Sequence, residues 1–127
     1  MNINYKIKDV VLTEEMQKDI ENLMRTLVER YLLRLDEETN IQIDLELSRE
    51  THHHLKGNVF YVEANMHLPG RILRAISHAP DIKTGIDEVE EDLKRQIKKY
   101  REKRDSRFRK DWQKLKAFLR GEKEQKF

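Results

Sequence analysis

Residues 59–77 read VFYVEANMHLPGRILRAIS and set the centre of the expected fold. Apolar and polar side chains alternate up to Leu68, and this spacing of two predicts a strand with one buried face. Pro69 and Gly70 then supply a tight turn. Residues 71–77 return as a further strand whose facing the pattern leaves open. The stretch therefore predicts a β-hairpin.

Two more strands are expected on the N-terminal side of this hairpin. Residues 41–48 (IQIDLELS) alternate without interruption between apolar and polar side chains, which is typical of a half-buried strand. Residues 2–9 alternate in the same way, with Ile3, Tyr5 and Ile7 on one side. The chain therefore has four candidate strands, each with one face suited to a core.

Two amphipathic helices complete the pattern. Thr13 stands where an N-cap is expected, and apolar residues follow every three or four positions to about residue 35. Residues 36–40 (DEETN) are expected to form a turn. The second helix opens at residues 80–81, and its apolar stripe extends to Tyr100. The order β-α-β-β-β-α predicts an α+β fold, a four-stranded sheet with two helices packed on one face.

The composition excludes several classes of protein. Of the 127 residues, 39% are charged and 37% hydrophobic, which fits neither a wholly disordered chain nor a membrane protein. The absence of cysteine excludes disulfides, thiol catalysis and cysteine-ligated zinc. No apolar run reaches the ~20 residues of a spanning helix, and no secretory signal is visible. We therefore expect a cytoplasmic protein with no membrane partner.

The formal net charge of +2 conceals a strong asymmetry along the chain. Residues 1–93 hold 11 lysines and arginines against 19 aspartates and glutamates. Residues 94–127 hold 15 lysines and arginines against 5 acidic residues. Such a division indicates a C-terminal part that binds a polyanion, and the obvious polyanions are nucleic acid and an acidic membrane surface.

Two interpretations of these cations remain open. A helix that is acidic first and basic last complements its own macrodipole, and Glu90–Lys94 and Glu91–Arg95 have the spacing of ion pairs. This first interpretation accounts poorly for the ten basic residues between 94 and 110. We therefore expect the lysine and arginine side chains to contact phosphates, which gives binding that does not depend on base sequence. The candidates are Lys94, Arg95, Lys98, Lys99, Arg101, Lys103, Arg104 and Arg107, and, unless they form only a solvated face, Arg25, Arg30 and Arg34 of the first helix.

We expect a domain over residues 1–104 and a basic, partly amphipathic tail over residues 105–127. Phe108 and Trp112 begin an apolar stripe in this tail, and they are candidates for docking or for stacking on a base. The tail can extend the second helix, fold back on the domain, or order on a partner. An isolated helix of this length is marginal in water, so we expect order only on the partner.

No catalytic or metal-binding pattern is present. His52, His53 and His54 are adjacent in a loop, and adjacent residues rarely converge on one ion. The sequence has no glycine-rich phosphate loop and no nucleophile or zinc-protease motif. We therefore expect no enzyme activity, no cofactor, no metal and no small-molecule substrate.

Three stretches carry a resemblance to a known family: MHLPGRILRA (66–75), DIKTGID (81–87) and LKRQIKKYREK (93–103). With them the sequence is similar, over roughly residues 1–104, to the ribosome hibernation-promoting factor family, also called ribosome-associated inhibitor or sigma-factor modulation proteins. This resemblance implies a fold like that of a double-stranded RNA-binding domain. It also implies binding at the decoding region of the small ribosomal subunit, which silences idle ribosomes in starvation or stationary phase. The family's rRNA-binding positions match Arg95, Lys98, Lys99, Arg101, Lys103 and Arg104.

The chain departs from the family's pattern at the start of the second helix. Lys83 and Gly85 stand where an aromatic residue and an alanine are frequent, and Pro80 is an added residue. The chain is too short for the second domain of long members, so it resembles a short form, and we expect a monomer when free. The alternatives are a generic double-stranded RNA-binding module and a protein that regulates a transcription factor.

Overall fold

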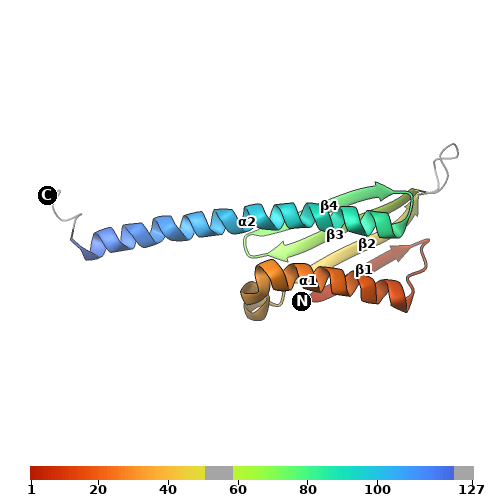
Figure 1. Cartoon of the computed structure of the whole chain (residues 1–127), viewed down its shortest axis with the longest axis horizontal. Helices are drawn as coiled ribbons and strands as arrows, with labels where there is room; N and C mark the ends of the chain where they lie inside the picture. Colours follow the sequence, from red (N-terminus) through yellow and green to blue (C-terminus); the bar gives the residue numbers. More distant parts are fainter. Residues whose placement is uncertain (51–58, 122–127) are drawn as a thin grey trace. The chain divides into compact units, whose positions relative to one another are not determined.

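The computed structural model describes residues 1–50 and 59–121 (Figure 1). Contacts within the chain divide it into two compact units, Met1–Gln96 and Ile97–Phe127. The predicted order β-α-β-β-β-α is confirmed, and so is the α+β class. The elements are β1 (Asn2–Lys8), α1 (Glu14–Thr39), β2 (Gln42–Glu50), β3 (Val59–Leu68), β4 (Arg71–Ala79) and α2 (Ile82–Leu119).

The four strands form one sheet in the order β1-β2-β3-β4. The pair β1–β2 is parallel, and the other two pairs are antiparallel. Parallel neighbours need a long crossover, which α1 supplies, whereas β3 and β4 are joined by the predicted turn at residues 69–70. Tyr5 pairs with Leu45, and Leu45 pairs with Ala64. Side chains that point to the same face of the sheet are therefore neighbours across the strands.

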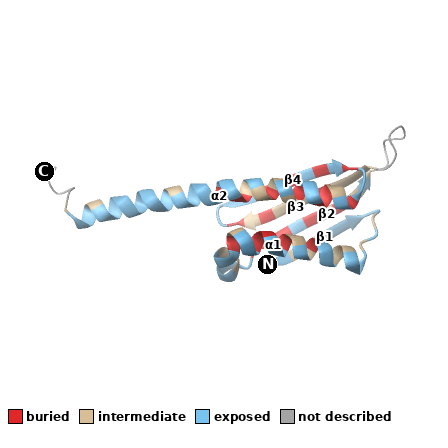
Figure 2. Cartoon of the chain, in the orientation of Figure 1, coloured by how far each residue is buried: buried red, intermediate tan, exposed pale blue. Residues whose placement is uncertain are grey.

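One face of the sheet is buried, and the two helices lie over it (Figure 2). The core side of β2 and β3 carries the apolar residues that the alternation predicts, among them Leu45 and Val62. The facing of β4, which the sequence left open, is now settled. Leu73 and Ala75 are buried, while Ile72 lies on the opposite, uncovered face.

Helix α1 begins as predicted but ends later. The hydroxyl of Thr13 accepts a hydrogen bond from the Met16 N–H at 3.1 Å, which is the expected N-cap. The turn predicted at residues 36–40 is wrong, because the helix continues to Thr39 past a local kink at Leu32. It ends at Asn40 (φ 53°), a residue type that tolerates the left-handed conformation.

Helix α2 also begins where it was predicted. The carboxylate of Asp81 accepts a hydrogen bond from the Thr84 N–H at 2.7 Å and satisfies one of the free N–H groups of the first turn. Gly85 allows the helix to approach β3 closely, because a Cβ at this position would stand 2.6 Å from Val62 Cγ2. The departure of Gly85 from the family's pattern therefore has a packing reason.

The expectation that residues 105–127 order only on a partner is wrong as far as Leu119, where α2 ends. Extension of the second helix was one of the three alternatives, and the structure shows it. The physical reason is cooperativity: a segment that continues an existing helix adds one hydrogen bond per residue and needs no new nucleus. None of the helices within residues 1–50 and 59–121 is long and apolar enough to cross a membrane.

Candidate nucleic-acid interface

The strongest concentration of positive charge lies in the basic segment of α2, which we define as residues 94–110. Ten of its 17 residues are lysine or arginine, against the two acids Glu102 and Asp105. A continuous helix displays these side chains at a regular 1.5 Å rise per residue. Because every residue from 101 to 105 is exposed, the cations there remain in water, where they can meet a phosphate backbone.

The predicted site residues of this segment are nearly all on the surface. Only Lys94 is half-buried. None of them is in the buried core. Changing a single solvated cation has little effect on the free energy of unfolding. The high number of cations in this segment is therefore not explained by stability. The exposed members are Arg95, Lys98, Lys99, Arg101, Lys103, Arg104 and Arg107.

Two of these arginines are held by neighbours on the same helix. Arg95 forms an ion pair with Asp92 at 3.3 Å, so the predicted pair with Glu91 is replaced by one three residues away. The guanidinium of Arg104 donates a hydrogen bond to the Tyr100 hydroxyl at 3.3 Å and lies 5.7 Å from the centre of its ring. Stacking on Tyr100 leaves the charge of Arg104 exposed while restricting its side chain.

The three arginines of α1 are also exposed. Arg30 lies over the ring of its neighbour Tyr31, 5.6 Å from the ring centre, while Arg25 and Arg34 have exposed side chains. They belong to the unit Met1–Gln96, as do Lys94 and Arg95. A groove shared by these arginines and the rest of the basic segment stays a prediction.

Phe108 and Trp112 lie on α2 with 69% and 51% of their surface exposed. They begin an apolar stripe that continues through three further exposed residues. No residue of the described chain covers this stripe, which is unusual for side chains of this size. Docking or stacking through Trp112 stays a prediction. The other members are Leu115, Phe118 and Leu119.

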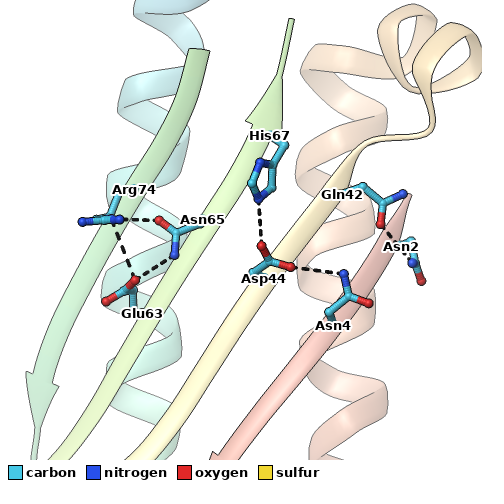
Figure 3. A network of polar contacts seen from close by, with 8 residues as sticks. All are labelled: Asn2, Asn4, Gln42, Asp44, Glu63, Asn65, His67 and Arg74. Atoms are coloured by element: carbon cyan, nitrogen blue, oxygen red, sulfur yellow. Dashed lines mark hydrogen bonds and ion pairs between the residues drawn. The ribbon is translucent and has the colours of Figure 1, made fainter. Parts of the chain in front are cut away.

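The sequence did not predict a polar network on the uncovered face of the sheet (Figure 3). The Asp44 carboxylate accepts hydrogen bonds from His67 at 2.8 Å and from Asn4 at 3.1 Å. Arg74 donates to Asn65 at 2.9 Å, and Asn65 donates to Glu63 at 2.7 Å. The alternation of β2 placed Asp44 on this face, but only the strand order shows which residues become its neighbours.

The ionisation of this network follows from its hydrogen bonds. The hydrogen bond from His67 holds the pKa of Asp44 below its ordinary value, and that from Asn4 adds to the effect. The hydrogen bond from Tyr61 lowers the pKa of Glu63, and the same bond raises the pKa of Tyr61 to about 12. Asp44 and Glu63 therefore stay ionised, which makes the uncovered face less suited to phosphate than the basic segment.

The described residues contain no group of three or more histidine, aspartate or glutamate side chains arranged to hold a metal ion. The three adjacent histidines, His52, His53 and His54, lie outside the described residues. The prediction about their role therefore remains untested.

The fold and its exposed cations define a small α+β protein whose second helix carries a basic segment. Residues 3–105 match the model of the family described as sigma 54 modulation protein / S30EA ribosomal protein. This match covers most of the chain, which therefore belongs to that family, and the resemblance inferred from the sequence is confirmed. The comparison with curated proteins found no match.

Several solved structures share the fold, among them the following two. The N-terminal domain of Protein Y from Thermus thermophilus is 24% identical, with a TM-score of 0.62 over 79% of this chain and 99% of that one. A ribosomal subunit interface protein from Coxiella burnetii is 21% identical, with a TM-score of 0.57 over 80% of this chain and 98% of that one. At these identities the likeness establishes the fold alone.

Proposed function

We propose that this protein binds the small ribosomal subunit at the decoding region and blocks the binding of messenger and transfer RNA. Ribosomes would be silenced in this way during starvation or stationary phase. The family supports the ribosome as partner. The observation that carries the proposal is the basic segment of α2, whose ten cations exceed what the helix needs for its own stability.

The mechanism requires no catalysis. Lysine and arginine side chains of the basic segment neutralise rRNA phosphates and release condensed counterions, which drives association without base recognition. Phosphate contacts fix position and orientation, so specificity comes from the shape of the rRNA surface. Inhibition follows from occupancy, because a protein seated where messenger RNA runs excludes it.

The test is charge reversal within the basic segment of the full chain. Replacing Lys98, Lys99, Arg101 and Lys103 by Glu should abolish co-sedimentation with purified small subunits and leave the thermal midpoint nearly unchanged. The matched control reverses four cations elsewhere. Co-sedimentation of the first variant at the wild-type level would refute the assigned interface. The control variant changes the exposed residues Lys6, Lys8, Lys18 and Arg71 to Glu.

Competition with RNA separates this proposal from a generic double-stranded RNA-binding module. Under our proposal a long RNA duplex displaces the protein from small subunits only in large excess. A generic module binds the duplex and the subunit with comparable affinity, and equal competition would favour it.

A second candidate function follows from the family's description, which also names modulation of sigma 54. In that case the partner is a transcription factor, and the contact is between proteins. The two functions differ in their response to ribonuclease. A complex that survives ribonuclease and contains the transcription factor without ribosomal subunits would support this second function and exclude the first.

A further inference from the structure

The end of α2 carries both cations and an apolar stripe, and rRNA phosphates account only for the cations. We define the amphipathic segment as residues 104–120. Its cations suit phosphates, but its apolar stripe does not, because leucine neither contacts phosphate nor stacks on a base. At helical spacing, Arg107 and Lys114 flank one side of the stripe, and Arg109 and Lys116 flank the other. The segment therefore fits a partner with an apolar floor and an acidic rim.

Two identical stripes are poor partners for each other. The amphipathic segment contains seven lysines and arginines against two aspartates. Pairing it with a second copy of itself brings two strongly positive helices together, which opposes association. Its complement must instead carry negative charge.

The unit Met1–Gln96 offers such a surface. A cavity of about 320 Å³ lies between α1 and the first turns of α2. Its floor includes Ile20, Ile82 and Ile86, and its rim includes Asp19 and Asp87. We call this cavity the docking groove. Lys83 also stands on the rim, where it forms an ion pair with Asp87 at 3.8 Å. Because these two charges cancel, Asp19 makes the rim negative.

The charges of the two units are opposite overall. Residues 1–96 hold 13 lysines and arginines against 19 acidic residues, whereas residues 97–127 hold 13 against 5. Opposite net charges attract at long range and speed the encounter of two molecules. An amphipathic helix seated in an apolar groove is a common mode of recognition between proteins.

We propose that the amphipathic segment of one molecule binds the docking groove of a second copy of this chain. Trp112 and its apolar neighbours cover the groove floor, and cations such as Arg107 and Lys114 face the rim at Asp19, the acid there that Lys83 does not pair with. The contact joins two different surfaces, so it builds open chains in which only the two end molecules keep an unused surface, unless a pair closes reciprocally. This proposal replaces the expectation of a monomer when free.

The contact has a regulatory consequence that rests on the proposed function. Arg107 belongs both to the basic segment and to the amphipathic segment, so self-association and rRNA binding compete for the same cations. Protein stored as an assembly would then be released by ribosomal RNA. The contact itself is tested without RNA, so its failure is distinguishable from a failure of the proposed function.

The experiment uses two full-length variants that each lose one surface. Asp19→Lys with Asp87→Lys reverses the groove rim, and Trp112→Gln with Leu115→Gln interrupts the centre of the stripe while keeping good helix formers. Sedimentation at low salt should show wild-type protein growing from its monomer mass of 15.4 kDa as concentration rises. Each variant alone should stay at the monomer mass. Their equimolar mixture should show a roughly twofold rise in mass and no more, because one working groove meets one working segment.

The remaining outcomes overturn the proposal. If the rim variant still self-associates, the stripe pairs with itself. If the wild type stays monomeric at all concentrations but binds vesicles of anionic phosphatidylglycerol through Trp112, the stripe serves a membrane surface. Glu29→Lys with Glu38→Lys is the matched control, because it makes the same charge change on α1 away from the groove. Far-ultraviolet circular dichroism checks that every variant folds.

Discussion

Gly85 of α2 lies against Val62 of β3 so closely that a Cβ at position 85 would stand 2.6 Å from Val62 Cγ2. Val62 is fully buried, and its β-branched side chain is restricted in χ1. This contact sets how near the second helix approaches the sheet. It therefore positions the first turns of α2, which lie in the unit Met1–Gln96.

We expect Gly85→Ala to destabilise the protein, although alanine favours helices more than glycine does. The overpacking should lower the free energy of unfolding by about 1–3 kcal/mol. Val62→Ala should recover part of this loss in the double variant, because it removes the atom that the new Cβ meets. Denaturant unfolding of the four proteins in the cycle measures the coupling. Strictly additive effects would show that position 85 does not act through Val62.

Tyr5→Phe should stabilise the protein. The Tyr5 hydroxyl is buried and has no hydrogen-bond partner within the described residues, and burial raises its pKa to about 12, with a contribution from Glu21. Because an unsatisfied buried hydroxyl is unfavourable, its removal should raise the free energy of unfolding by about 1 kcal/mol. Tyr61→Phe is the control and should lower stability, since the Tyr61 hydroxyl donates a hydrogen bond to Glu63. A loss of stability in Tyr5→Phe would indicate that its hydroxyl has a partner in solution.

The contribution of Tyr61 should depend on alkaline pH. The hydrogen bond to Glu63 raises the pKa of Tyr61 from 10.0 to about 12, so folding favours the neutral phenol. Its stabilisation is fully present below the unfolded value of 10.0 and disappears as pH rises through the folded value of about 12. The difference in unfolding free energy between wild type and Tyr61→Phe should therefore shrink across that range. A difference that stays constant would exclude this titration as its source.

Binding to small subunits should weaken steeply with salt. If about six phosphates are neutralised, the plot of log affinity against log salt has a slope of about −4 to −5. A titration with potassium chloride measures it, and each cation removed from the basic segment should make the slope shallower by nearly one. A slope near zero would indicate an apolar contact between proteins and favour the second candidate function.

The sequence predicts which face of the inner strands is buried, because the alternation of apolar and polar residues is a local pattern. In β2 and β3, apolar residues such as Leu45 and Val62 alternate with polar ones, and the core takes the apolar set. In β4 the pattern is ambiguous, because Ile72 and Leu73 are adjacent and both apolar. Only the pairing with β3 decides that Leu73 is buried and Ile72 exposed.

The end of α1 and the polar network depend on residues that are distant in sequence. Asp36 reads as part of a turn, but its carboxylate accepts a hydrogen bond from the Ile41 N–H at 2.9 Å and pairs with the terminal amine of Met1 at 2.8 Å. His67 reaches Asp44 only because β2 and β3 are antiparallel in this register. The cations of the basic segment needed no such knowledge, since charge density along a helix is read directly from the sequence.

A single proline substitution tests whether α2 extends through residues 105–119 in the free protein. Ser106→Pro in the full chain interrupts the helix, because proline lacks the N–H and clashes with the preceding turn. Residues beyond it then need a nucleus of their own and should melt, removing the helical signal of about a dozen residues at 222 nm. The thermal midpoint of the unit Met1–Gln96 should not change, because residues 107–112 are exposed and contribute little to a core. Ser106→Ala is the control and should keep or raise the helical signal. If Ser106→Pro leaves that signal unchanged, the segment is not helical in the free protein, and order on a partner becomes the better account of Trp112.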